Sequence, residues 1–214
     1  MPIMFDTSGF RQINEDVWDY PLTGDRVLRQ YTPGVPTIPA ALEDLPTLRR
    51  SLAEGSAESG CLIEAHVVSF AGLPALLRFE KMRHWNQPGG LIYTASIIVP
   101  RATGAAALLV LCADNDFAGL RDAAIATRVG IDRMNPPHPY APHVRGDLPY
   151  SMGDDAQWDQ EFPGHALTRA RRWFGELSRT ARIDPRFAAL PPFSGPIPDF
   201  PGMTPLSDPP LPPS

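Results

Sequence analysis

The side chains best suited to chemistry in this sequence are its histidines and a group of acids late in the chain. A zinc site needs three or four converging ligands, and it is commonly anchored by two histidines one helical turn apart. No two histidines here share such a turn. His138, His143, Asp154 and Asp155 could form a metal site on a loop, but solvated loop side chains are the favoured interpretation. The sequence therefore predicts no metal and no cofactor.

Nucleophilic chemistry finds little support in the motifs. The two cysteines, Cys61 and Cys112, lie among apolar residues of predicted strands, and such burial keeps a thiol protonated and unreactive. We expect two buried free thiols. A disulfide between them is possible only if their strands are neighbours in the sheet. Neither a GxSxG elbow nor a glycine-rich phosphate loop occurs. The sequence assigns no catalytic residue.

Charged side chains in the middle of the chain could meet across a hairpin. Glu64 and Glu80 would then form a carboxylate pair of the kind used in acid–base catalysis. Arg78 and Lys81 lie close to them in sequence, so ion pairing on a solvated sheet face is the favoured interpretation.

The densest basic group belongs to the last predicted helix. Aspartates and glutamates close by offset its charge, so a solvated helix face is favoured over a site for an acidic partner. The group comprises Arg169, Arg171, Arg172, Arg179 and Arg182.

Large aromatic residues gather in an irregular segment, 130–164, that is rich in proline and glycine. A loop of this length is longer than usual, which favours a functional role or disorder. Aromatic side chains in such a loop either anchor it to the core or form a binding surface. Both interpretations are open. The candidate partner-binding residues are Tyr140, His143, Tyr150, Trp158 and Phe162.

The element that must position these residues is a run of four apolar segments within 61–113. Breaks rich in glycine and proline separate the segments, which is typical of antiparallel strands in a meander. The third and fourth strands are the most apolar and should lie centrally. In the first strand, the apolar set expected to face the core is Cys61, Ile63, Ala65 and Val67.

Helices should flank this sheet. Apolar residues at helical spacing predict helices over 44–58, 117–129 and 166–182. A loose alternation at 25–31 predicts one further strand. The inward residues expected in the second helix are Phe117, Leu120 and Ala124.

The chain is predicted to form one domain, 1–184, followed by a proline-rich tail, 185–214. The expected fold class is α+β, with four or more antiparallel strands flanked by helices in an α/β/α sandwich. Proline accounts for 26 of the 214 residues, well above the usual share of about 5%. Phe187, Phe193 and Phe200 are expected to pin the tail to the body.

Composition and charge bear on the choice of partners. The net charge of −5 gives no support to a nucleic-acid partner. The longest apolar runs are about half the length of a membrane span, which argues against a membrane partner. The amino terminus does not resemble a signal peptide, so a cytoplasmic location is the default. The preference for arginine over lysine is typical of a GC-rich bacterial genome.

The order helix, four-stranded meander, helix, loop, helix resembles the PsbP-like α/β sandwich. Gly119–Ala123 (GLRDA) and Phe162–Trp173 (FPGHALTRARRW) also look like segments of uncharacterised bacterial proteins of this shape. The resemblance covers residues 25–184. It implies a sheet flanked by helices and a binding or accessory role, and it carries no catalytic residue.

The hypothesis we favour is a non-catalytic interaction or accessory module that binds another protein, such as an immunity (toxin-neutralising) or secretion-accessory protein. The alternative is a small-molecule-binding protein or unassigned enzyme with a pocket between the sheet and the last helix. A third hypothesis is a subunit of a homo-oligomer joined through an open sheet edge.

Overall fold

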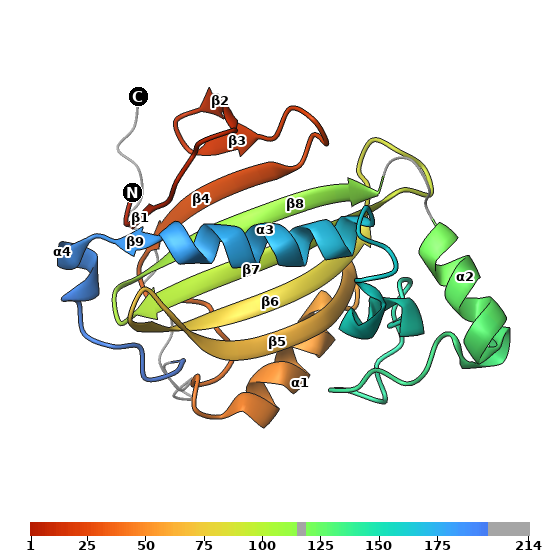
Figure 1. Ribbon diagram of the computed structural model, residues 1–214. Helices are drawn as coiled ribbons and strands as arrows, with labels where there is room; N and C mark the ends of the chain where they lie inside the picture. The colour runs from red at the N-terminus through yellow and green to blue at the C-terminus, as the bar shows by residue number, and fades with distance from the viewer. Residues whose placement is uncertain (115–118, 197–214) are drawn as a thin grey trace, which may run out of the picture.

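The computed structural model describes residues 1–114 and 119–196, and its centre is a seven-stranded antiparallel sheet (Figure 1). Four long strands form a meander in which each pairs with the next along the chain. The expected α+β fold with an antiparallel meander is confirmed. The four strands are β5 (Gly60–Phe70), β6 (Leu73–Arg83), β7 (Leu91–Arg101) and β8 (Gly104–Asp114).

The remaining strands of the sheet come from the amino-terminal part of the chain. β4 (Arg26–Pro33) pairs with β8, and β3 (Val17–Asp19) and β2 (Arg11–Asn14) continue the sheet beyond it. The alternation at 25–31 predicted β4 correctly. β2 and β3 are too short for an alternation of apolar and polar residues to be recognised in the sequence. β7 and β8 are inner strands, as their apolar sequences predicted. Ile3–Met4 (β1) and Arg182–Ile183 (β9) form a separate two-stranded pair.

Helices cover both faces of the sheet, which gives three layers (Figure 1). α3 (Ala166–Thr180) lies along β7 and β8 on one face, and α1 (Leu45–Ser56) packs on β5 at the other. Leu167 of α3 and Ile97 of β7, neither of them accessible to solvent, belong to the first core. Leu48 of α1 belongs to the second core. Asp44 accepts a hydrogen bond from the Thr47 amide and so caps α1 as helix-start patterns predict.

A bulge in β5 corrects the predicted face assignment of that strand. The register shifts between Leu62 and Glu64, which leaves Ile63 as an extra residue. Ile63 packs in the α3-side core, whereas Ala65, from the same predicted set, packs with Leu62 on the α1 side. The prediction of one core-facing set was therefore wrong, because the bulge reverses the alternation and both faces are covered.

β5 is an outer strand of the sheet, and side chains take up part of its outward backbone. The amide of Leu62 donates to Ser56 Oγ (3.1 Å), and its carbonyl oxygen lies 2.7 Å from His138 Nε2. The carbonyl oxygen of Ala65 accepts from Arg49 Nε at 2.7 Å. These bonds close the first half of the edge to a further strand.

α2 (Leu120–Val129) stands at one end of the sheet and packs mainly against the loop that follows it (Figure 1). Its buried residues are Arg121 and Ile125, while Leu120 is 55% exposed. The prediction that Leu120 faces inward was wrong, because Arg121 occupies the inward position and pairs there with Asp159. Phe117, expected in the same set, lies outside the described residues.

The segment 130–164 contains three short 3-10 turns and otherwise follows the surface of the body. The turns are η1 (Ile131–Arg133), η2 (Met152–Asp154) and η3 (Ala156–Trp158). Ser151 begins η2 with a capping box. The Asp154 carboxylate accepts from the Ser151 amide, and the Ser151 hydroxyl oxygen accepts from the Gly153 amide. The long loop therefore has local structure of its own.

The chain after residue 184 begins with α4 (Pro185–Ala188) and stays packed on the body. Phe187 is buried in the α3-side core and Phe193 in the α1-side core, as the pinning prediction required. Phe200 lies outside the described residues. The first part of the predicted tail thus contributes to both cores.

The two thiols are buried and free, as predicted. Cys61 lies on β5 and Cys112 on β8, and two strands separate them in the sheet. Their strands are not neighbours, so the disulfide alternative has no structural basis. Within residues 1–114 and 119–196, no helix combines the length and apolar character needed to cross a membrane.

Candidate functional site

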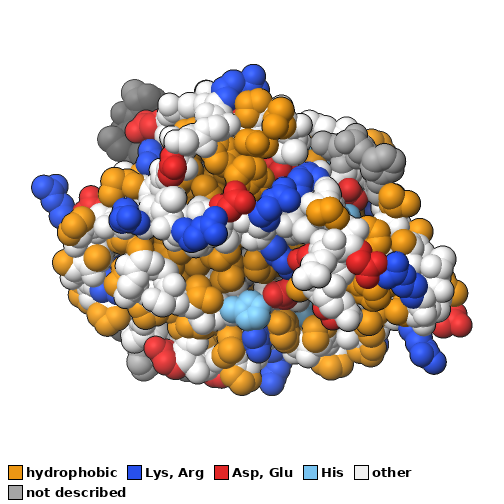
Figure 2. Space-filling view, in the orientation of Figure 1, with side chains coloured by type: hydrophobic (Ala, Val, Ile, Leu, Met, Phe, Trp, Pro, Cys, Tyr) orange, Lys and Arg blue, Asp and Glu red, His pale blue; other side chains and the backbone are white. Residues whose placement is uncertain are grey.

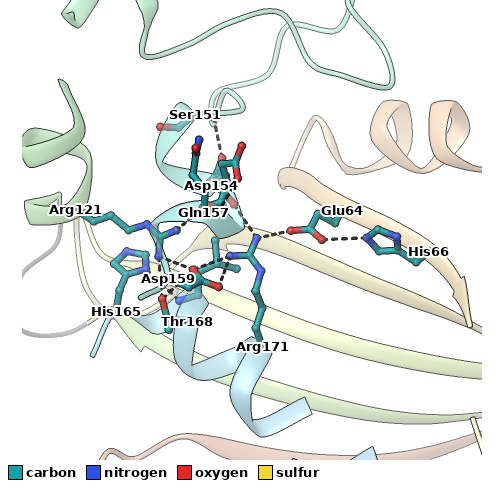
Figure 3. A network of polar contacts seen from close by, with 12 residues as sticks. Glu64, His66, Arg121, Ser151, Asp154, Gln157, Asp159, His165, Thr168 and Arg171 are labelled. Carbon is teal, nitrogen blue, oxygen red and sulfur yellow. Dashed lines mark hydrogen bonds and ion pairs between the residues drawn. The ribbon is translucent and has the colours of Figure 1, made fainter. Parts of the chain in front are cut away.

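A network of half-buried and buried charges joins α3 to the loop before it and to β5 (Figure 3). Arg171 donates Nη1 to both carboxylate oxygens of Asp159, at 2.9 and 3.0 Å, and Nη2 to Glu64. The other oxygen of Glu64 lies 3.0 Å from His66 Nε2. The prediction of a solvated arginine face on this helix was therefore wrong for Arg171, which points toward the sheet.

A second inward arginine of α3 meets Asp25, which is only 1% exposed. Arg169 donates Nε and Nη2 to this carboxylate at 2.9 to 3.2 Å, and Trp173 Nε1 donates at 2.9 Å. Burial by itself would raise the pKa of Asp25, but the hydrogen bonds from Arg169, Thr23 and Trp173 and the charge of Arg169 together outweigh burial and hold that pKa below its ordinary value. Asp25 thereby fixes the start of β4 to the middle of α3.

Arg121 is the link between α2 and the rest of the molecule. It is 2% exposed, and its Nη1 donates to Asp159 Oδ1 (3.0 Å) and Thr168 Oγ1 (2.9 Å). Its Nη2 donates to the carbonyl oxygen of Asp155 at 2.9 Å. Its Nε is buried without a hydrogen-bond partner among the described residues. One guanidinium group therefore ties α2 both to the loop and to α3.

A buried ion pair lies beneath the same loop. Lys81 Nζ and Asp154 Oδ2 are 2.6 Å apart, and both side chains are nearly inaccessible to solvent. Burial raises the pKa of Asp154, although Lys81 and the Ser151 amide act in the opposite direction. The expectation of Lys81 on a solvated sheet face was wrong.

This arrangement of charges holds elements together and offers little reactivity. The carboxylates of Asp25, Asp154 and Asp159 each accept from an arginine or a lysine, and a guanidinium does not release its proton near neutral pH. The hydroxyl of Ser151 is also engaged, because it donates to Asp122 and accepts from the Gly153 amide. Within the described residues, the network contains no activated nucleophile.

A cavity of about 680 Å³ opens where β8 ends and α3 begins. Its charged lining comes from Asp114, Arg121, Arg169 and Arg172, together with His165. His165 caps α3 by accepting from the Leu167 amide. Burial and the charges of Arg121 and Arg169 lower the pKa of His165 to about 3, so its ring is neutral at physiological pH.

Two of the candidate partner-binding residues surround a buried histidine. Tyr140 and Tyr150 are half-buried and make edge contacts with His138, at centroid distances of 5.7 and 5.9 Å. Burial raises the pKa of Tyr150 to about 12. These contacts favour the anchoring interpretation for both tyrosines. His143 is exposed, with its Nε2 3.0 Å from Glu54 of α1.

The other two candidates lie beside α2. The Arg128 guanidinium is 5.6 Å from the ring centroid of Trp158, and that of Arg121 is 5.9 Å from the ring of Phe162. Phe162 also lines the 680 Å³ cavity. The five predicted residues therefore do not form one surface, since only this pair borders the exposed helix.

The residues considered for a loop-borne metal site have separate partners. His138 bonds the Leu62 carbonyl, and Asp154 pairs with Lys81. Asp155 caps η3. In the part of the chain that the structure describes, no three histidine, cysteine, aspartate or glutamate side chains come together as metal ligands.

The outward surface of α2 is unusually apolar for a helix at the edge of a molecule. Leu120 is 55% exposed and Ile131, just after the helix, is 74% exposed. Ala123 and Thr127 of α2 are exposed as well, at helical spacing from Leu120. We call these four residues the α2 stripe. At the place of α2 in Figure 2, hydrophobic side chains reach the surface among charged ones.

Sequence reasoning missed the inward charges, although one signal was available. Leu77 and Phe79 alternate with polar neighbours in the sequence of β6, and Lys81 follows them at the same spacing of two. The pattern thus already placed Lys81 on a buried face. Asp25 and Arg121 carried no such signal, because their partners lie more than thirty residues away in sequence.

Comparison with known proteins supplies no further constraint on the site. Neither a protein-family model nor a curated protein sequence matches the chain. The resemblance to the PsbP-like sandwich stays a prediction.

Proposed function

We propose that this protein is a protein-binding module that docks a partner along the α2 stripe. The observation that carries the proposal is the exposure of two large apolar residues, Leu120 on α2 and Ile131 just after it, beside a helix held in place by buried polar bonds. Large apolar patches on a folded surface commonly mark interaction sites.

The way α2 is attached supports this proposal. An amphipathic helix normally turns its apolar side to the core. Here Arg121 and Ile125 face the body, and Arg121 is fixed by Asp159 and Thr168. The apolar side chain of Leu120 is thereby held in solvent. A partner that covers it would recover the free energy of burial, about 2 kcal/mol for one large aliphatic side chain.

The shape of the stripe fits an amphipathic helix of the partner protein. Small side chains, Ala123 and Thr127, occupy the middle and permit close approach of a second backbone. Leu120 stands at one end on α2, and Ile131 stands at the other end, just beyond the Gly130 that ends the helix. Helix-in-groove recognition uses apolar anchors of this kind.

A non-catalytic binding role would agree with the charge network beside the stripe, whose carboxylates Asp154 and Asp159 are paired with basic side chains. An immunity protein or a secretion-accessory protein acts by covering a partner's surface, which requires no reactive group. The bacterial origin and cytoplasmic location expected from the sequence stay predictions.

Site-specific photo-crosslinking in the native host tests the proposal. A photoreactive amino acid at position 127 should give an adduct of discrete mass, whereas one at Arg50, an exposed position on α1, should not. Leu120→Asp should abolish the adduct at position 127. The matched control is Ile13→Asp, because Ile13 is 54% exposed and lies on β2.

The proposal fails if position 127 gives no adduct, or if Leu120→Asp and Ile13→Asp reduce its yield equally. Circular dichroism should show that both variants keep the wild-type fold, since each replaces a side chain already more than half exposed. This check separates lost binding from lost structure.

A further inference from the structure

The 680 Å³ cavity beside α2 has features that the protein-binding proposal does not use. Its volume lies within the range of about 300–1,000 Å³ that is usual for small-molecule sites. Arg121, Arg169 and Arg172 line it, against a single carboxylate, that of Asp114. Arg121 and Arg169 are paired with carboxylates outside the lining, those of Asp159 and Asp25, so Arg172 is the guanidinium group left to attract an anionic ligand.

The three arginines differ in how many of their hydrogen-bond donors already have partners within the protein. Arg169 has Asp25 and two backbone carbonyl oxygens as partners. Arg121 uses both terminal nitrogens within the protein, but its Nε is buried with no partner among the described residues. Arg172 is exposed, and none of the hydrogen bonds and ion pairs found among the described residues includes it. Arg172 is therefore the cation most available to a ligand.

Apart from Thr23 and His165, the remaining side chains of the lining are apolar, and some of them are open to solvent. Leu22 is 83% exposed and Leu120 is 55% exposed, and both border the cavity together with Phe162. Two exposed leucines beside the same opening are unfavourable in water. A ligand with an apolar body would cover them while its charged end reaches the arginines.

We propose that this cavity binds an amphipathic anion, with a carboxylate or phosphate head at Arg172 and Arg121 and an apolar body between Leu22, Leu120 and Phe162. The neutral ring of His165 at the cavity wall adds no competing charge. Charge-assisted hydrogen bonds to a guanidinium supply orientation, and burial of the apolar body supplies most of the affinity. The cavity shares Leu120 with the α2 stripe, whereas Arg172, Leu22 and Phe162 lie outside the stripe.

Titration calorimetry on the full chain tests this inference with two probes, decanoate and decyl phosphate. At least one should bind saturably, and at least tenfold more tightly than decanol, which lacks the charge, or acetate and inorganic phosphate, which lack the chain. The two heads distinguish a carboxylate ligand from a phosphate ligand.

Arg172→Gln should weaken the better probe about tenfold, the loss expected for one charge-assisted contact. Arg179→Gln is the matched control, because it removes another exposed arginine two turns further along α3. The affinity of the Arg179→Gln variant for the probe should equal that of the wild type. Leu120→Ser should also weaken the probe, while the Leu120→Ser variant keeps its unfolding midpoint.

Three results would overturn the inference. They are the absence of saturable binding by either probe, equal affinities for decanol and the charged probes, and equal effects of the Arg172 and Arg179 substitutions. A protein adduct from position 127 in the host would leave these measurements unaffected, so the two proposals can fail separately.

Discussion

Asp25 shows how single buried charges organise this protein. Its carboxylate accepts from Arg169 and Trp173, both of which lie more than 140 residues further along the chain. A buried charge is costly when it lacks a partner, and much of that cost is recovered when several donors surround it. The same reasoning applies to Lys81 with Asp154. Each pair joins segments that are distant in sequence.

Replacing Asp25 by asparagine should destabilise the fold near neutral pH by about 3 kcal/mol, because Arg169 would lose its counter-charge. The pKa of Asp25 is lowered in the folded state. Its ionised form therefore stabilises the fold above the unfolded pKa of about 4, and this contribution disappears as the pH falls through the folded pKa. Urea unfolding should show a large gap between wild type and variant near pH 7. An equal gap near pH 2 would contradict the assignment.

Lys81→Met should cost about 3–5 kcal/mol, the usual effect of leaving one member of a buried pair alone. Asp154 would then be a buried carboxylate without a cation. The double variant Lys81→Met/Asp154→Asn should lose less than the sum of the single variants, because neither change then leaves a charge unpaired. Equilibrium unfolding of the four proteins measures this coupling. Additive losses would show that the pair is not coupled.

At the scale of elements, sequence patterns predicted long segments well. Four segments of strand length in 61–113 became β5 to β8, since each carries enough apolar residues to define its period. The bulge at Ile63 left no trace in the pattern. The prediction of which side of α2 faces the body was also wrong. A helix with many alanines has no strong apolar side, so one arginine with a distant partner decides how the helix is turned about its axis.

Two glycines should respond in opposite ways to alanine. A Cβ on Gly60 would lie 2.3 Å from the Lys81 carbonyl oxygen, so Gly60→Ala should destabilise the β5–β6 pairing by about 1–3 kcal/mol. Gly175, within α3, has open space at that position. Gly175→Ala should therefore stabilise the protein by about 0.5–1 kcal/mol through helix propensity.

Thermal unfolding of both variants beside the wild type checks this pair of predictions. The midpoint should fall for Gly60→Ala and rise for Gly175→Ala. Equal midpoints for the two variants would mean that the close approach at Gly60 is relieved by a shift of the backbone.

On the scale of the whole molecule, the candidate site was harder to predict than the fold. The sheet follows from local patterns, whereas the cavity collects Leu22, Leu120 and Arg172 from three separate parts of the chain. No spacing in the sequence brings them together. The aromatic residues of the loop indicated the region of the candidate site through Trp158 and Phe162, which lie beside α2. Tyr140 and Tyr150 did not, because they anchor the loop.

The two thiols can report opening of the whole fold. Burial raises the pKa of Cys61 to about 11 and also raises that of Cys112, so neither should react with iodoacetamide in the folded protein at pH 8. Cys112 lies in the α3-side core and should react only after global unfolding. Cys61 borders a cavity of about 190 Å³ beneath the loop and should react sooner. Mass spectrometry resolves the two rates. Faster labelling of Cys112 would contradict the topology.

The hydrogen bonds on the outer side of β5 bear on how this protein behaves at high concentration. Ser56, His138 and Arg49 occupy backbone groups that another molecule would otherwise recruit to extend the sheet. Heat that detaches both α1 and the His138 loop without melting the sheet would free these groups. Fibrillar assembly should then start at β5, and a solution kept below that temperature should stay clear.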